Sequence, residues 1–116
     1  MSNQRPVLEA IAKGNDFLIL GSRYQRQPGG LLSLAAQPVL EPKDIVGKTI
    51  LGQTPTDART IETVLALSNL PTDDFTFIPA GSDPQALIEG QGDALFAFVT
   101  NQPIALEKRG LVKDKD

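Results

Sequence analysis

The chain has 116 residues, of which 41% are hydrophobic and 22% charged, and its net charge is −3. These values are typical of one globular domain, and the scattered Lys and Arg residues exclude the basic stripe of a nucleic-acid surface. Cysteine and histidine are both lacking, which excludes disulfides, thiol chemistry and the commonest general base and transition-metal ligand. The sequence shows no membrane span, and residues 1–6 lack the apolar core of a signal peptide.

The N-terminal part is predicted to begin with a helix and a short strand. Residues 6–13 carry apolar side chains at helical spacing, and Gly14 is a fitting stop. Residues 17–20, Phe-Leu-Ile-Leu, are consecutive apolar residues, which predicts a short buried strand. The elements that follow are predicted to be a turn-rich loop, an extended strand and a connector, at residues 22–30, 31–36 and 37–47.

From residue 48 onward, strands are predicted to alternate with helices. The strands are expected at residues 48–51, 75–79 and 94–99, and the last is apolar enough to be covered on both faces. Each strand is followed by a polar bend that opens a helix. The expected caps are Thr56 or Asp57 for the first helix, a capping box at residues 82–85 for the second and Thr100 or Asn101 for the third. Asn69 is expected in the left-handed stop position of the first helix, before Pro71.

This alternation predicts an α/β fold with three layers, αβα, around a mostly parallel sheet with right-handed crossovers. No paired carboxylates, calcium loop or phosphate loop stands out in the sequence. We therefore expect no enzyme activity, no metal and no cofactor.

Three segments carry a resemblance to a known family. They are Leu-Glu-Ala-Ile-Ala-Lys-Gly at residues 8–14, Asp-Ile-Val-Gly-Lys-Thr-Ile at 44–50 and Gly-Gln-Gly-Asp-Ala at 90–94. In their order and spacing they are similar to the NMT1/THI5-like solute-binding proteins of ABC importers, which include binders of nitrate, aliphatic sulfonates, taurine and thiamine-pyrimidine precursors. The resemblance implies a periplasmic-binding-protein type II lobe, an ABC permease as partner and a periplasmic or extracytoplasmic location. Because no export signal is visible, a cytoplasmic location stays open.

Members of that family are longer and hold the ligand between two lobes, so the resemblance implies a truncated chain. Its parts would be a lobe-one remnant with connector at residues 1–40, a lobe-two α/β domain at 41–112 and a charged tail at 113–116. The strand at 17–20 would then lack its neighbours, and bare strand edges favour pairing with another chain. We therefore expect a homodimer, formed by edge pairing or by a swapped N-terminal arm.

Polar residues near the carboxyl ends of strands form the candidate ligand site, because open α/β sheets bind ligands at that edge. Tyr24 can stack on a flat ligand and Arg23 can pair with an acid group. The candidate ligand-binding residues are Ser22, Arg23, Tyr24, Gln53, Thr54, Thr56, Thr100, Asn101 and Gln102. The alternative interpretation is that the bends are ordinary helix caps and that residues 22–24 are a solvated loop.

Two functions follow from these patterns. The first is a solute-binding module of the ABC importer type that recognises a small organic or anionic molecule. The alternative is a non-catalytic, truncated domain that acts through self-association and has no ligand site left.

Overall fold

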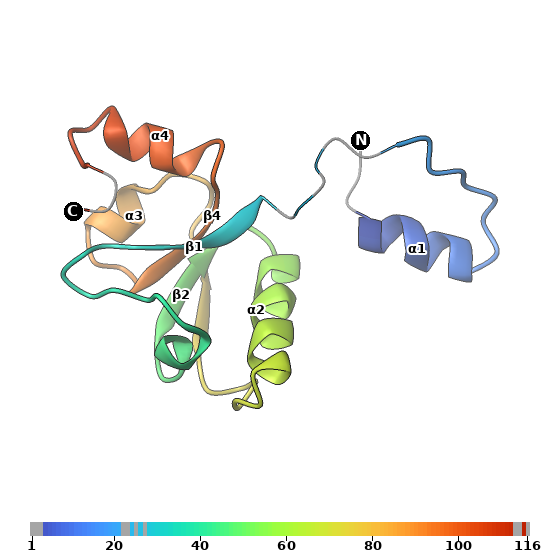
Figure 1. The fold of residues 1–116 in the computed structure, drawn as a ribbon, viewed down its shortest axis with the longest axis horizontal. Coiled ribbons are helices and arrows are strands. Elements are labelled where there is room, and N and C mark those ends of the chain that lie inside the picture. Colours follow the sequence, from blue (N-terminus) through green and yellow to red (C-terminus); the bar gives the residue numbers. More distant parts are fainter. Residues whose placement is uncertain (1–3, 22–23, 25, 27, 113–114, 116) are drawn as a thin grey trace.

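The computed structural model describes residues 4–21, 24, 26, 28–112 and 115 (Figure 1). It contains one four-stranded sheet, whose strands are β1 (Gly29–Ser33), β2 (Thr49–Gly52), β3 (Thr76–Pro79) and β4 (Ala94–Phe98). The helices are α1 (Gln4–Ala12), the 3-10 helix η1 (Pro42–Ile45), α2 (Pro55–Leu67), α3 (Gln85–Ile88) and α4 (Gln102–Glu107).

The strand order in the sheet is β1-β4-β2-β3. Strand β2 runs parallel to both neighbours, so that Ile50 lies opposite Phe77 of β3 and Ala94 of β4. Strand β1 is antiparallel to β4 and forms one end of the sheet. The predicted α/β fold with a mostly parallel sheet is therefore confirmed, and the carboxyl ends of β2, β3 and β4 meet at one edge.

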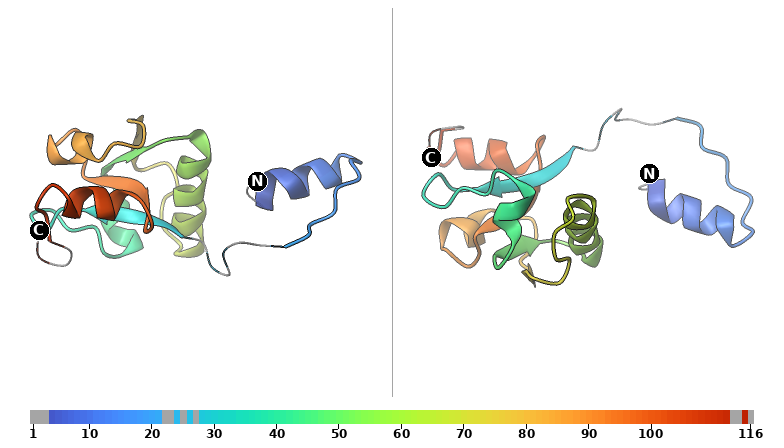
Figure 2. Two further views of the ribbon diagram at one scale, coloured as in Figure 1. Left: turned by 90° about the horizontal axis from the view of Figure 1, so that it is seen from above. Right: turned by 60° about the horizontal axis from the view of Figure 1, so that its bottom comes forward.

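Helices cover both faces of the sheet, as Figure 2 shows. Successive residues of a strand point to opposite faces, so Ile50 packs with α2 and η1 while Leu51 packs with α3. In the same way, Phe96 belongs to the core on the α2 side and Leu95 to the core on the α3 side. The predicted three-layer arrangement is confirmed.

Asp93 fastens the start of β4 to the start of β2. Its Oδ2 accepts a hydrogen bond from Thr49 N at 2.8 Å, and its own N–H donates to Thr49 O at 2.8 Å. Its Oδ1 lies 3.5 Å from Lys48 Nζ. The Asp that the sequence placed before the last strand therefore bridges two neighbouring strands.

Two predicted helix caps are wrong and one helix stop is confirmed. The N-cap of α2 is Thr54, and Asp57 lies in the first turn with its carboxylate turned back to the cap, because Pro55 already occupies the first helical position. No capping box opens α3: its N-cap is Pro84, and Gln85 N donates to Asp83 Oδ1 at 2.9 Å. Asn69 takes the left-handed conformation with φ 56°, as predicted.

The predicted buried strand at residues 17–20 is also wrong. Phe17, Leu18, Ile19 and Leu20 are 57%, 84%, 54% and 91% exposed, and they belong to no strand of the described sheet. A strand needs a neighbour to pair with, and Figures 1 and 2 show α1 and the segment after it lying apart from the sheet in every view.

The strand predicted at residues 31–36 begins two residues earlier, at Gly29. It pairs with β4, so residues 29–33 are part of the same sheet as residues 49–98. The division of the chain at residue 40 stays a prediction.

Candidate functional site

The carboxyl edge of the parallel strands gathers three polar bends, at residues 53–54, 80–84 and 99–101. Strands β2 and β4 are direct neighbours, so the first and third bends lie on adjacent strands. Thr54, Thr56, Thr100 and Asn101 are exposed here, and Gln53 is half-buried. The structure thus brings five of the nine candidate residues to one edge with side chains that solvent reaches.

The bend after β2 already holds a carboxylate. Asp57 is 9% exposed, and its Oδ2 accepts hydrogen bonds from Gln53 N at 2.9 Å and from Thr54 N at 2.8 Å. A negative group at the amino end of a helix is favourable, and it also repels a second anion from the same place. This bend therefore offers a ligand the hydroxyls of Thr54 and Thr56 rather than its backbone amides.

The bend after β4 is fastened by Gln102, which is only 1% exposed. Its Oε1 accepts a hydrogen bond from Phe98 N at 2.9 Å, and its Nε2 lies 3.4 Å from Ser82 O in the bend after β3. Gln102 therefore links two bends of the edge. The neighbouring Thr100 and Asn101 stay exposed, and Asn101 makes no side-chain cap hydrogen bond to α4.

The third group of candidate residues precedes β1. Ser22 and Arg23 lie outside the described residues, and Tyr24 is 41% exposed. Because β1 is antiparallel to β4, with Gly29 opposite Phe98, the chain enters β1 at the same edge where β4 ends. Pro28, whose O accepts a hydrogen bond from Val99 N, and Gly29 thus lie at the edge that carries Thr100 and Asn101.

Charged side chains at this edge tie helices together. Asp83 Oδ1 lies 3.1 Å from an Arg109 guanidinium nitrogen, which joins the start of α3 to the end of α4. The pKa of Asp83 is lowered, first by the hydrogen bond from Gln85 N and then by Arg109.

A second carboxylate with a lowered pKa lies in η1, before β2. The pKa of Asp44 is lowered because the N–H groups of Glu41 and Leu40 donate to its carboxylate.

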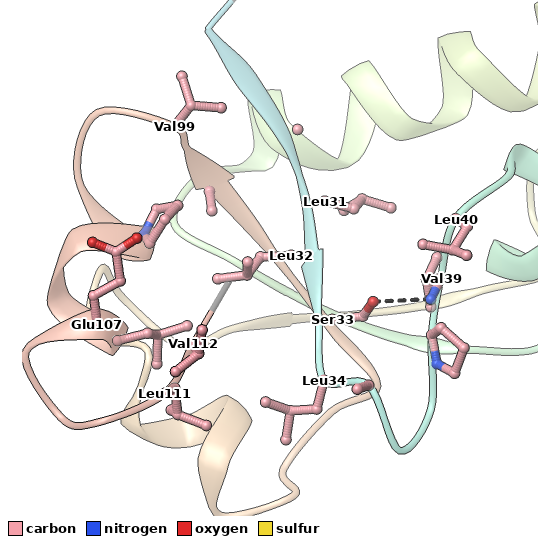
Figure 3. Close-up of a pocket in the computed structure, with 16 residues that line it drawn as sticks. Leu31, Leu32, Ser33, Leu34, Val39, Leu40, Val99, Glu107, Leu111 and Val112 are labelled. Carbon is pink, nitrogen blue, oxygen red and sulfur yellow. Dashed lines mark hydrogen bonds between the residues drawn. The ribbon is translucent and has the colours of Figure 1, made fainter. Parts of the chain in front are cut away.

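A larger and a smaller hollow lie elsewhere in the described part of the chain, and the larger runs along β1. This hollow, the β1 groove, has a volume of about 560 Å³ and is bordered by the segment before η1 on one side and by α4 with the residues after it on the other (Figure 3). A second hollow of about 250 Å³ lies between β1, η1 and α2. Of the nine candidate residues, the seven that the structure describes line neither hollow. Residues that line the β1 groove include Leu31, Leu32, Leu34, Val39, Leu40, Val99, Leu106, Glu107, Leu111 and Val112.

Sequence reasoning missed the β1 groove, since nothing local in the sequence places β1 beyond β4 at the end of the sheet. Within the described part of the chain, no group of three or more Asp, Glu, His or Cys residues could hold a metal ion. The same part contains no helix that is long and apolar enough to cross a membrane.

Comparison with known proteins gives one family and several structural relatives. A family model described as NMT1/THI5 like matches residues 1–114. No curated protein sequence matches the chain.

Solved structures match with TM-scores just above 0.5. The alkanesulfonate-binding protein SsuA from Xanthomonas axonopodis pv. citri, bound to MOPS, is 25% identical, with a TM-score of 0.53 over 62% of this chain and 26% of that one. The periplasmic aliphatic sulphonate binding protein SsuA from Escherichia coli is 18% identical, with a TM-score of 0.56 over 70% and 29%. A periplasmic sulfonate-binding protein SsuA of a putative sulfonate ABC transporter from Methylobacillus flagellatus KT is 24% identical, with a TM-score of 0.53 over 71% and 25%.

These relatives support the predicted fold class, that of periplasmic binding proteins of type II. The chain spans only about a quarter of the length of the solved structures that it matches.

Proposed function

Because the chain belongs to the NMT1/THI5-like family, we propose that it is a solute-binding module of the ABC importer type. In this proposal it takes a small organic or anionic ligand at the carboxyl edge of β2 and β4, with an alkanesulfonate as the first candidate. The observation that carries the proposal is the gathering of exposed hydroxyl and amide groups on those two adjacent strands. The SsuA from Xanthomonas, which is described as bound to MOPS, supports the choice of ligand class.

Within this edge, each residue has a proposed role. Thr100 and Asn101 donate hydrogen bonds to the ligand, and the hydroxyls of Thr54 and Thr56 complete the contact from the neighbouring strand. The Asp57 carboxylate lies beneath the first bend, so the anionic end of a ligand is expected at the bend after β4 instead. The Arg23 guanidinium is the chemical group in the candidate set that suits a sulfonate or carboxylate.

Partners and location follow from the same family. We propose that the module works outside the cytoplasmic membrane and delivers its ligand to an ABC permease. We propose no catalytic step, since the matched proteins are binding proteins.

Thermal unfolding with added ligand tests the proposal. Ligand pockets usually bury most of a ligand's surface, and this edge covers it from one side, so we expect weak binding. A dissociation constant of about 1 mM and a ligand concentration of about 10 mM would stabilise the fold by about 1.4 kcal/mol. We expect MOPS, ethanesulfonate or taurine to raise the midpoint temperature of unfolding by an amount that matches this stabilisation. Chloride at equal ionic strength should leave the midpoint unchanged.

The double variant Thr100→Ala with Asn101→Ala should abolish this shift, because it removes both donors without removing a cap hydrogen bond. Thr63→Ala and Thr72→Ala are matched controls, since Thr63 lies on the exposed side of α2 and Thr72 lies near the opposite edge of the sheet. A flat response of the unaltered chain to all sulfonates, nitrate and pyrimidines would overturn the proposed site.

Self-association is the second candidate function, and two observations favour it. One is the exposed apolar segment at residues 17–20, and the other is the position of β1 at the end of the sheet.

A further inference from the structure

One edge of β1 carries backbone groups that point away from the rest of the sheet. Val99 N donates to Pro28 O at 3.1 Å, and hydrogen-bonded and non-hydrogen-bonded pairs alternate along an antiparallel ladder. Gly30 and Leu32 therefore turn their N–H and C=O groups toward β4. By the same alternation, Gly29, Leu31 and Ser33 turn theirs to the open side, where the described sheet has no further strand.

The β1 groove surrounds this open side. Figure 3 shows β1 crossing the middle of the groove, with Leu31, Val39 and Leu40 on one side and Leu32, Leu111 and Val112 on the other. Of the described residues that line it, Glu107 alone is charged. Leu40 is 82% exposed and Val99 64%, so apolar side chains stand in water along both borders. An open strand edge between two apolar borders is a slot with the shape and chemistry of a missing β-strand.

The chain itself supplies a segment of matching chemistry. Residues 17–20 are uncharged, apolar, free of helix or strand structure and more than half exposed, and they include a β-branched and an aromatic residue. The structure holds this segment apart from its own β1, as both views of Figure 2 show. One molecule thus presents an unfilled strand position and an unpaired strand-like segment at separate places.

We propose that residues 17–20 of one copy add as an extra strand to the open edge of β1 in a second copy. The N-terminal arm, residues 4–20, of each copy packs on the other copy. This reciprocal exchange forms a closed two-fold dimer in which the open edge of each β1 is covered. Residues 21–28 link the arm to β1, and eight residues can extend over about 26–29 Å, enough to reach a neighbouring molecule. Backbone hydrogen bonds would come from Gly29, Leu31 and Ser33.

This arrangement explains why both surfaces are apolar in the same chain. In the dimer, Leu18 and Leu20 would leave water for the borders of the β1 groove, which are otherwise exposed themselves. The contact rests on the second candidate function, self-association. It lies along β1 and involves none of the proposed ligand donors after β2 and β4, so the outcome of the ligand-binding test does not decide it.

Light scattering after size exclusion, over a dilution series of the full chain, tests the proposal. We expect a dimer that dissociates on dilution. Leu18→Asp and Leu40→Asp should each raise the dissociation constant at least about tenfold, because each places a charge in the apolar contact. Both side chains are more than four-fifths exposed in the single chain, so neither change disturbs its core. Leu67→Asp, at an equally exposed position at the end of α2, should leave the dimer intact.

Mixing the two damaging variants distinguishes this contact from its competitors. The arm of Leu40→Asp and the groove of Leu18→Asp are both unaltered, so the mixture should form a heterodimer with one complete contact. Pairing of two β1 edges predicts instead that Leu18→Asp still dimerises, and pairing of two arms predicts that Leu40→Asp does. Either of those results overturns the proposal, as does failure of the mixture to associate. A monomer at every concentration, the outcome expected if the arm folds back on its own β1, overturns it too.

Discussion

Gly92 is a position where one added carbon should destabilise this fold. It lies between α3 and β4, next to Asp93, whose N–H and carboxylate both bond to Thr49 of β2. These two bonds hold the backbone of Gly92 against β2. A Cβ on Gly92 would lie 2.6 and 2.8 Å from carbons of the Leu51 side chain and 3.1 Å from Thr49 O.

The structure sets the size of the effect. Leu51 is fully buried, between Leu87 and Leu95, so it has no open space to move into. Overpacking of this kind costs about 1–3 kcal/mol. For a domain of this size, each kcal/mol lowers the unfolding midpoint by roughly 4–8 °C. We therefore expect Gly92→Ala to fold with clearly reduced stability.

Urea unfolding followed by far-ultraviolet circular dichroism measures the loss, since the chain has no tryptophan. Gly30→Ala is the matched control: it also lies beside the sheet core, but a Cβ there meets no atom within 4 Å. That variant should be neutral or gain about 0.4–1 kcal/mol. Both are best compared in the Leu18→Asp background, where the proposed dimer does not contribute. Equal stabilities of the two variants would refute the reasoning.

Four further variants, at three residues, test the links around the sheet edges. Asp93→Ala should cost about 1–3 kcal/mol in urea unfolding, because it leaves the partly buried N–H of Thr49 in β2 unpaired. Asp93→Asn should cost less because its amide oxygen still accepts that bond. Gln102→Leu should cost a similar amount by removing the acceptor for the last N–H of β4, with an unchanged circular dichroism spectrum. The pKa of Asp83 is lowered, first by the hydrogen bond from Gln85 N and then by Arg109. Ionised Asp83 therefore stabilises the fold above its ordinary pKa of 3.8, and this stabilisation is lost as the pH falls below that value. In Asp83→Asn, the free energy of unfolding should therefore fall less steeply between about pH 5 and about pH 3. The same pH dependence of that free energy in both proteins would contradict this assignment.

The alternating part of the fold was predictable from local sequence. Apolar runs bounded by polar bends located β2, β3 and β4 to within about two residues, and a positive φ at Asn69 follows from the side chain's tolerance of that conformation. The parallel pairing of these strands was predictable because a helix lies between successive strands in the sequence. The position of β1 was not predictable in this way, since its pairing with β4 joins residues far apart in the sequence.

The wrong prediction at residues 17–20 has a different cause. An apolar run predicts burial only when a partner exists to bury it, and composition alone does not reveal whether the partner is in the same molecule. The same run that sequence reasoning assigned to the core is, in the folded chain, the most exposed apolar segment described. Its exposure is what links the sequence pattern to the proposed contact between copies.

The polar bends pose the opposite problem, because the residue types that hold ligands are the same types that cap helices. Asp57 and Gln102 belong to the same polar bends as Thr54 and Asn101. Asp57 and Gln102 are buried, however, and their side-chain oxygens accept hydrogen bonds from backbone N–H groups. A residue whose hydrogen bonds hold a bend in shape cannot release them to a ligand without leaving those partly buried backbone N–H groups unpaired. If the edge binds a solute, Gln102→Leu should therefore act through stability and the alanines at Thr100 and Asn101 through affinity. Finding the reverse would mean that the bends serve only the fold.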